Sequence, residues 1–387
     1  MNNKKIRNFK NNNTLDKIIK EVIPLKRSFS ESLFEKSIPE KNVYIKNNPS
    51  KNYIDTSLQP YLSNNLNEFK NIKIDMTKDK SSGSFGNVYL KIKAKNNEDL
   101  NIIYKEIHDT DSEKTQFKAL IFHYLLQKYY TINKISELKY LCKLHEFGSI
   151  EGNKKLNYAI MENCGKDLLN YFEDIIKINK NLSLKKKLMK LLILFRECCK
   201  AVKIIHNLGY LHLDIKPENF MIKNNQIKII DFDCVKKNGY KTKKLFGTMN
   251  YISNDRLINA YSKPPKETTL TYYHDIFSLG CMFIYLLYIY VFNLDIDIAC
   301  PIVKSINIKS NFDTAVINQR INYSNESFKN MITYINDNFN DLKDKQINDD
   351  LINIIIDLIR KMVNPDVEKR YDNIDYVIEH IDSIIKK

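Results

Sequence analysis

One stretch decides how this 387-residue chain folds: LHLDIKPENFMI at residues 211–222 and, after a short polar turn, IKIIDFD at residues 227–233. A carboxylate (Asp214), an ammonium (Lys216) and an amide (Asn219) fall within six residues. A second carboxylate, Asp231, follows 17 residues after the first. Two short apolar runs joined by a polar turn predict a hairpin that brings these groups together. Hard oxygen ligands for a divalent cation, with one carboxylate left to orient a hydroxyl, favour phosphoryl transfer from a metal-bound nucleotide.

Upstream of this stretch the pattern is typical of β-strands. Apolar residues alternate after the Gly/Ser-rich turn SSGSFG at residues 81–86, and another apolar run ends at Lys105. Glycines in such a turn let backbone N–H groups approach phosphate oxygens. Lys105 is placed either to bring its ammonium to those phosphates or to face water on an edge strand, and the residues alone leave both readings open.

Helical spacing of apolar residues predicts one helix among the strands, at 112–130, and long helices at 184–208, 276–294 and 351–362. We therefore expect an α+β chain, with a small β-rich lobe that contains one helix and a larger α-helical lobe. The uncharged run at 276–294 has the length of a membrane span. Its serine, glycine, asparagine and tyrosines favour a helix buried in protein, so we expect no span.

Composition narrows the partners without choosing among them. The formal charge of +15 favours acidic proteins, anionic lipids or nucleic acid. No aromatic-basic binding module is present, so nucleic acid is not expected. Residues 1–75 hold 14 Lys or Arg against 8 Asp or Glu, and predict a basic, mostly disordered N-terminal extension. The seven cysteines form no C-x-x-C pair, which favours a reducing intracellular compartment, the cytoplasm, and leaves the nucleus open.

The motif residues resemble the catalytic loop and the D-F-G motif of eukaryotic-type protein kinases, and the likeness runs from Ile72 to the C-terminus. The resemblance implies a bilobal protein-kinase fold over 76–387, with the N-lobe and hinge at 76–163 and the C-lobe at 164–387. It implies that Asp214 orients or deprotonates the substrate hydroxyl and that Lys216 neutralises the γ-phosphate. It also implies that the metal ligands are Asn219 and Asp231.

The same resemblance implies an ATP site, with Mg²⁺, or Mn²⁺ in its place, as the cation. Gly83, Gly86 and Val88 match the glycine-rich loop and the residue above adenine, and Ser81 stands at the first glycine of that loop. The remaining residues expected at the nucleotide are Lys105 at the α- and β-phosphates, Met161 as gatekeeper, and Glu162 to Cys164 beside adenine.

Downstream matches point to the class of substrate. Residues 247–251 resemble the substrate-facing loop, and Arg370 matches an arginine that pairs with an acid behind that loop, for which Asp255 is the expected partner. Lys216 and Thr248 both match serine/threonine kinases. The resemblance therefore implies a serine/threonine protein kinase that acts on protein substrates, and we expect a monomer.

Several positions depart from the family pattern. Asp233 replaces the glycine of D-F-G, and the helix at 112–130 offers only Glu113 or Gln116 as a partner for Lys105. These changes, with Ser81, keep a second hypothesis open: a pseudokinase that retains the fold without phosphoryl transfer. Leu213 replaces the arginine that receives a phosphorylated activation-loop residue, so we expect activity without that phosphorylation.

Five lysines lie between Asp233 and Gly247 and are not matched by any acidic residue there. One interpretation is recognition of acidic or already phosphorylated substrates. The alternative is a solvated, mobile loop. The sequence does not choose between them.

Overall fold

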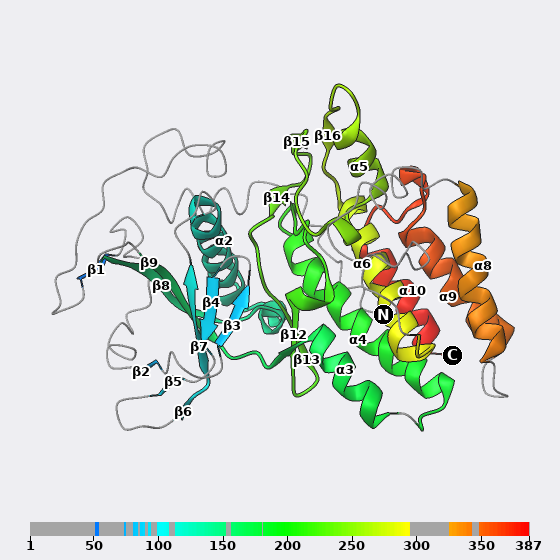
Figure 1. Cartoon of the computed structure of the whole chain (residues 1–387), viewed down its shortest axis with the longest axis horizontal. Coiled ribbons are helices and arrows are strands. Elements are labelled where there is room, and N and C mark those ends of the chain that lie inside the picture. Colours follow the sequence, from blue (N-terminus) through cyan, green and yellow to red (C-terminus); the bar gives the residue numbers. More distant parts are fainter. Residues whose placement is uncertain are drawn as a thin grey trace, which may run out of the picture. The chain divides into compact units, whose positions relative to one another are not determined.

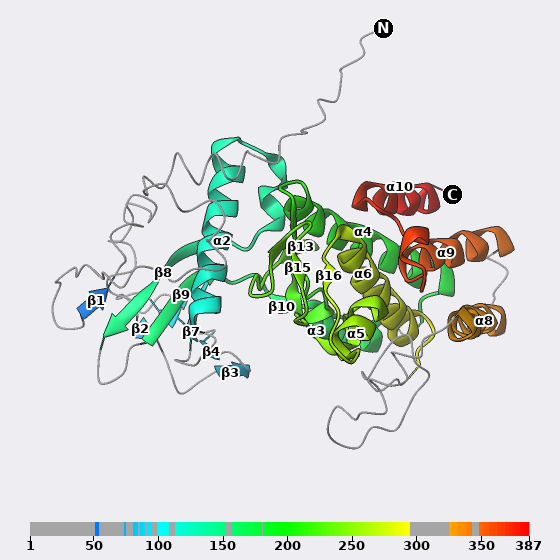
Figure 2. The same ribbon diagram turned by 90° about the horizontal axis from the view of Figure 1, so that it is seen from above.

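The computed structural model describes residues 51–53, 73–74, 80–83, 86–89, 92–93, 99–107, 113–151, 156–179, 181–294, 325–342 and 348–386. The chain divides into two compact units, and each is described by itself (Figures 1 and 2). The β-rich unit comprises Met1–Leu138 and Cys142–Asn163, and the helical unit comprises Lys139–Leu141 and Cys164–Lys387. This division into a β-rich part and a helical part confirms the predicted α+β class.

The β-rich unit is built on an antiparallel six-stranded sheet, ordered β1-β8-β9-β7-β4-β3, beside a smaller sheet, β2-β5-β6. The strands are β1 (Lys51–Tyr53), β2 (Lys73–Ile74), β3 (Lys80–Gly83), β4 (Gly86–Tyr89), β5 (Ile92–Lys93), β6 (Asp99–Leu100), β7 (Ile102–Ile107), β8 (Leu144–Glu151) and β9 (Leu156–Glu162). Strands β1 and β2 fall within the predicted N-terminal extension; the rest of residues 1–75 lies outside the described residues.

The helix α2 (Glu113–Ile132) confirms the helix predicted at 112–130. It packs against β8 and β9. Two of its side chains hold it there. Partly buried Gln127 exchanges two hydrogen bonds with the backbone of Leu144, at 2.8 and 3.1 Å. His123, which is buried, lies 2.6 Å from the carbonyl oxygen of Cys142.

The helical unit contains α3 (Leu168–Ile178), α4 (Leu184–His206), α5 (Asn254–Tyr261), α6 (Tyr272–Leu286), α8 (Asn325–Asp341), α9 (Asp349–Met362) and α10 (Ile374–Ile385). Its core lies where α6 packs on α4 and α9, and α10 packs along α4. Phe195 and Phe283 meet there with ring centroids 4.6 Å apart, and both are fully buried. The predicted helices at 184–208 and 351–362 are confirmed by α4 and α9.

One described helix, Tyr272–Val291, is long and apolar enough to cross a membrane by length and composition. It comprises α6 and the single π-helical turn Leu287–Val291 that continues it. Within the protein, 94% of its most apolar window is buried. This burial agrees with the prediction of a helix buried in protein at 276–294.

Seven short strands lie within the loop regions that the structure describes in the helical unit. They are β10 (Lys166–Asp167), β11 (Tyr210–Leu211), β12 (Phe220–Lys223), β13 (Gln226–Ile229), β14 (Lys236–Lys237), β15 (Lys241–Thr242) and β16 (Thr268–Thr269). The predicted hairpin is confirmed by the pairing of β12 with β13. Its turn residues, Asn224 and Asn225, have φ angles of 51° and 62°, the left-handed conformation that a two-residue hairpin turn needs and that asparagine tolerates.

Candidate active site

Asp214 lies at the centre of a hydrogen-bond network in the helical unit. Its Oδ1 accepts from the Thr248 backbone N–H at 2.7 Å and from the Thr248 hydroxyl at 2.8 Å. The Lys216 ammonium donates to that hydroxyl at 2.9 Å and lies 3.3 Å from Asp214 Oδ2. The carboxylate and the ammonium of the motif are therefore joined to the threonine of the 247–251 loop, a contact that was not predicted from the sequence.

The charge of Asp214 is stabilised by these neighbours. Burial alone raises the pKa of the carboxyl, but Lys216 and the hydrogen bonds from Thr248 outweigh it, so the pKa lies below its ordinary value. The group is ionised at neutral pH and accepts hydrogen bonds only. A carboxylate of this kind orients a hydroxyl group well and is a weak base toward its proton.

Asn219 and Asp231 lie on either side of the β12–β13 hairpin and are joined through its backbone. The N–H of Ile230 donates to the Asn219 carbonyl at 3.0 Å. The Asn219 amide nitrogen donates to the Asp214 carbonyl at 2.7 Å and to Asp214 Oδ2 at 3.1 Å. This leaves the amide oxygen of Asn219 and the carboxylate of Asp231 as hard ligands for a cation.

These two ligands fit the chemistry of Mg²⁺. Among the described residues, no group of three or more His, Cys, Asp or Glu side chains could hold a metal ion. Mg²⁺ is commonly held by one or two protein oxygens together with waters and substrate phosphates. The donor set provided by Asn219 and Asp231 is therefore that of a cation bound jointly with a nucleotide.

Asp275, on α6, fixes the backbone of the catalytic loop. Buried Asp275 accepts from the N–H of His212 and of Leu213, each at 2.8 Å, and lies 2.9 Å from His206 Nε2. Burial alone raises the pKa of Asp275, but His206 and these backbone bonds outweigh it and hold the pKa below its ordinary value. The loop residue Leu213 adopts φ 66° in this arrangement. Sequence reasoning missed this role of Asp275.

Gly247 permits the substrate-facing loop to lie against the catalytic loop. Its φ is +93°, and a Cβ at this position would lie 2.1 Å from the carbonyl oxygen of Leu213. Only glycine fits that approach without moving backbone. The contact that Thr248 makes with Asp214 therefore depends on the glycine that precedes it.

Leu213 stands where the resemblance places an arginine, and the structure shows what the leucine does. It is buried with Leu211 and Leu270 in an apolar cluster, and partly buried side chains pack against that cluster, among them Tyr240 and Phe246. The segment that follows Asp231-Phe232-Asp233 is thus held to the catalytic loop by apolar contacts.

The residues predicted at the nucleotide phosphates lie on neighbouring strands of the β-rich unit. Ser81 is opposite Val88, Gly83 is opposite Gly86, and Val88 is in turn opposite Lys105. The structure therefore places the predicted glycine turn, the residue above adenine and the lysine on β3, β4 and β7. The side chain of Ser81 lies outside the described residues.

The predicted partners of Lys105, Glu113 and Gln116, have side chains that lie outside the described residues. Another α2 residue, His123, is near enough for the two charges to interact. Burial, which is the largest cause, and the charge of Lys105 lower the pKa of His123 to about 4, against an opposing hydrogen bond to Cys142. The imidazole is therefore neutral at neutral pH, and the electrostatic effect of Lys105 on it could not be predicted from the sequence.

The residues predicted beside adenine are divided between the units. Met161 is buried on β9 opposite Ile103. The Glu162 N–H donates to the Lys143 carbonyl at 2.8 Å, and Glu162 Oε2 accepts from the Lys143 N–H at 3.1 Å. Cys164 is buried in the helical unit.

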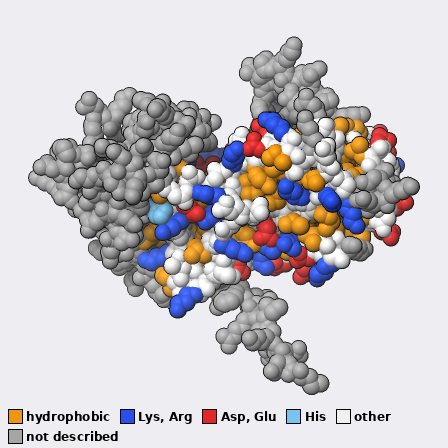
Figure 3. Space-filling model, turned by 90° about the horizontal axis from the view of Figure 1, so that it is seen from below, with side chains coloured by type: hydrophobic (Ala, Val, Ile, Leu, Met, Phe, Trp, Pro, Cys, Tyr) orange, Lys and Arg blue, Asp and Glu red, His pale blue; other side chains and the backbone are white. Residues whose placement is uncertain are grey.

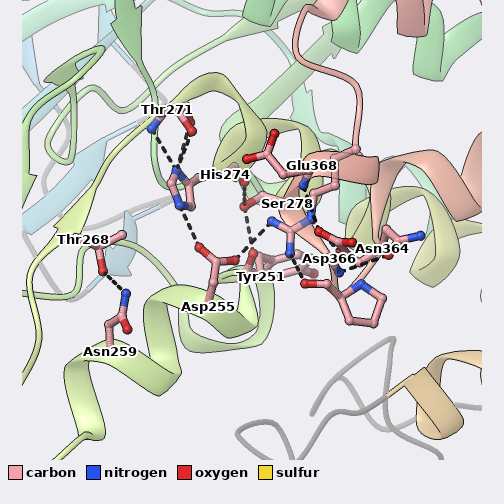
Figure 4. Close-up of polar contacts among 12 residues, drawn as sticks. Tyr251, Asp255, Asn259, Thr268, Thr271, His274, Ser278, Asn364, Asp366 and Glu368 are labelled. Atoms are coloured by element: carbon pink, nitrogen blue, oxygen red, sulfur yellow. Dashed lines mark hydrogen bonds and ion pairs between the residues drawn. The ribbon is translucent and has the colours of Figure 1, made fainter.

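A buried ion pair lies behind the substrate-facing loop, and Figure 4 shows the surroundings of its acid, Asp255, in close-up. The Arg370 guanidinium donates to Asp255 Oδ1 at 3.1 Å, which confirms Asp255 as its predicted partner. The Arg370 side chain has no exposed surface, and its guanidinium carbon lies 4.6 Å from the centroid of the Phe277 ring. The pair ties α5 to the segment that precedes α10.

His274 is a third member of this site that sequence reasoning missed. Its Nε2 donates to Asp255 Oδ2 at 2.9 Å, and its Nδ1 accepts from the Thr271 N–H at 2.9 Å (Figure 4). Burial alone raises the pKa of Asp255, but His274 and Arg370 outweigh it and hold the pKa far below its ordinary value. The spacing of Thr271 and His274 is that of a helix capping box, which was the available signal.

The paired strands that carry Gly83, Gly86 and Lys105 in the β-rich unit, and the catalytic loop with its cation ligands in the helical unit, are each features of the protein-kinase class. The family model described as "Protein kinase domain" matches residues 81–381. The chain belongs to that family, and its α+β architecture is the bilobal kinase fold. Members of the family are ATP-dependent phosphotransferases.

Curated relatives support the same assignment over shorter stretches. "Calcium-dependent protein kinase 22" of Arabidopsis thaliana is 33% identical over 30% of this chain and 24% of its own length. "Serine/threonine-protein kinase mph1" of Schizosaccharomyces pombe and "Dual specificity protein kinase TTK" of Mus musculus are each 30% identical over 24% of this chain. The matches cover 15% and 12% of those two relatives, so the chain spans less than a quarter of the length of all three.

Proposed function

We propose that this chain is a serine/threonine protein kinase, which transfers the γ-phosphoryl group of ATP to protein hydroxyls with Mg²⁺, or Mn²⁺ in its place, as the cation. The observation that carries the proposal is the junction of Asp214, Lys216 and Thr248. Ionised Asp214 faces the residue of the substrate-facing loop that the serine/threonine resemblance singles out, and the two are in direct hydrogen-bond contact.

Each residue of the helical unit has a role that its contacts support. Asp214 accepts a hydrogen bond from the substrate hydroxyl and orients it, while the two bonds from Thr248 hold the carboxylate in position. Lys216 supplies positive charge beside the transferred group. Asn219 and Asp231 would hold the cation, which supplies charge neutralisation at the phosphates when it is bound. Catalysis of this kind is mainly positioning and electrostatic stabilisation.

The competing function is a pseudokinase that binds nucleotide or a partner without transfer. One observation favours it: Asp233 brings an additional carboxylate beside Asp231, and its N–H lies 3.4 Å from Asp231 Oδ1. The presence of Asp214, Lys216, Asn219 and Asp231 in connected geometry favours the enzyme.

The test is transfer of labelled phosphate from MgATP to casein and to a basic protein, by the full chain and by an Asp214→Asn variant. Asn keeps the shape of the side chain and removes its charge, and circular dichroism would verify its fold. We expect the variant to lose roughly 10²- to 10⁴-fold in rate, the range for a positioned general base. No transfer by either protein, with ATP still bound, would establish the pseudokinase.

Compartment and assembly are part of the proposal. We infer a monomer without a membrane span that acts in the cytoplasm, with the nucleus left open. The six described cysteines are free thiols, which supports a reducing compartment. Sedimentation of the purified chain and imaging of a tagged full-length chain test the two inferences separately.

A further inference from the structure

The segment after Asp233 gathers positive charge beside the substrate-facing loop. Residues 234–247 contain five lysines and no acidic residue. Within this segment β15 pairs with β16, with Thr242 opposite Thr268, and Figure 1 shows the two strands side by side next to α5. The loop before β16 adds Lys263 and Lys266 against one acid, Glu267.

These lysines differ in what their ammonium groups do. Lys236 is used within the unit: its Nζ lies 4.5 Å from the centroid of the Phe246 ring and donates to the Val235 carbonyl. Three others, hereafter the β15 lysines, are exposed and form no ion pair with any acid that the structure describes: Lys241, Lys243 and Lys244.

The loop before β16 adds a further cation. Lys266 is exposed and lies two residues before Thr268, which pairs with Thr242 at the end of the β15–β16 ladder. Like charges on neighbouring segments repel one another, and an anion bound among them offsets that repulsion. Elsewhere the charge is dispersed: Figure 3 shows Lys and Arg side chains scattered among acidic, polar and hydrophobic ones over the described part of one face.

The β15 lysines are within reach of the residues that flank a bound substrate hydroxyl. Thr248 touches Asp214 directly, and Lys244 precedes it by four residues. At about 3.3–3.6 Å per residue, an extended chain puts the Cα atoms of Lys244 and Thr248 no more than about 14 Å apart. When the hydroxyl of a bound peptide lies at Asp214, the peptide residues two to four positions from that hydroxyl can therefore reach these ammonium groups.

We propose that the β15 lysines, together with Lys266, bind acidic side chains within about four residues of the phosphorylated hydroxyl, so that the preferred substrates are acidic peptide segments. A phosphoserine at one of these flanking positions is also an anion and carries more negative charge than Asp or Glu, so it should bind the same lysines more tightly. This inference rests on the proposed function, since it names the substrate class of the same site.

The test compares the full chain with the triple variant Lys241→Ala/Lys243→Ala/Lys244→Ala. The matched control is Lys185→Ala/Lys186→Ala/Lys187→Ala, which removes three lysines from the first turn of α4. Substrates are serine peptides of one length that differ only in three flanking residues: Glu, Gln, Lys or phosphoserine. We measure kcat and KM at low and high salt, and the binding of labelled peptides to each protein in an Asp214→Asn background by fluorescence anisotropy.

We expect the triple variant to lose roughly 3- to 100-fold in kcat/KM toward the Glu peptide, the range that three exposed ion pairs supply, with the loss in KM. The Gln peptide should be unaffected, the control variant should behave as the native chain, and the preference should weaken in high salt. The phosphoserine peptide should show the same dependence more strongly.

The remaining outcomes decide between the two proposals. Equal transfer to the Glu and Gln peptides would overturn the acidic preference and leave the kinase proposal intact. Lysine-dependent binding of the Glu peptide without any transfer would support the surface and overturn the kinase. Absence of both transfer and binding would overturn both. Tighter lysine-dependent binding of an RNA oligonucleotide than of the Glu peptide would assign the surface to nucleic acid and overturn the inference.

Discussion

The buried pair of Arg370 and Asp255 allows a worked prediction of stability. The change is Asp255→Asn, which keeps the shape of the side chain and removes its charge. It leaves a guanidinium with no exposed surface next to neutral acceptors only, namely the carbonyl oxygens of Asn364 at 2.7 Å and Pro365 at 3.4 Å. His274 also loses the carboxylate oxygen that accepts from its Nε2.

The size of the effect follows from this geometry. Removing one partner of a buried pair costs about 3–5 kcal/mol, because the other charge stays buried without compensation. The Asp255 side chain is 23% exposed and Arg370 keeps two carbonyl partners, so we expect the low end, about 3 kcal/mol. The exposed pair of Asp357 with Lys361 serves as the control, and Asp357→Asn should cost about 0.5 kcal/mol or less.

The measurement is urea unfolding followed by circular dichroism, with the midpoint and slope compared between variants. Arg370→Met and the double variant with Asp255→Asn complete a double-mutant cycle. If the pair itself carries the effect, the double variant will be less destabilised than the sum of the single changes. Additive losses, or a loss for Asp255→Asn no larger than that of Asp357→Asn, would refute the reasoning.

The same pair predicts how stability depends on pH. The folded pKa of Asp255 lies below the unfolded value, so its contribution is complete above the unfolded pKa and is lost as pH falls through it toward the folded pKa. The unfolded carboxyl titrates near pH 4. The difference between the native chain and Asp255→Asn should therefore be largest at neutral pH and shrink between about pH 5 and pH 3. A difference that stays constant over this interval would contradict the assignment.

Three further predictions follow from the loops and the core of the helical unit. Thr242→Ala should keep its rate of phosphoryl transfer, because Leu213 offers no cation to a phosphate; abolished transfer with an intact fold would contradict this. Gly247→Ala should lower the free energy of unfolding by at least about 1 kcal/mol and reduce transfer, because its φ is left-handed and its Cβ meets the Leu213 carbonyl; urea unfolding measures the first effect. Burial raises the thiol pKa of Cys198 and Cys199, so both should resist a thiol reagent until the chain unfolds, as counted by absorbance.

The part of the site that could be predicted is the part encoded locally. Residues 211–233 hold the acid, the lysine, the amide and the second acid at fixed spacing around a hairpin whose turn is visible in the sequence. Once Asn224 and Asn225 form that turn, the backbone bond between Ile230 and Asn219 joins the two predicted cation ligands. The helices at 184–206 and 349–362 were predictable for the same reason, since periodicity is a local property.

The contacts that could not be predicted join segments far apart in the chain. Asp275 holds the catalytic loop from 62 and 63 residues away, and nothing in its local sequence shows that its oxygens face backbone N–H groups. The electrostatic effect of Lys105 on His123 was missed for a related reason. Which residues of α2 face the sheet is decided by tertiary packing, and His123 reads locally as one polar residue in an apolar stretch.

One departure from the family pattern is compensated by the residues around it, and that compensation supports the proposed enzyme over a pseudokinase. Leu213 replaces an arginine, and its apolar cluster holds the segment after Asp233 to the catalytic loop. The cluster includes contacts to Phe246, which directly precedes the 247–251 loop, and so helps to keep Thr248 on Asp214. A chain without transfer has no need of that contact, whereas a kinase that has lost the arginine does.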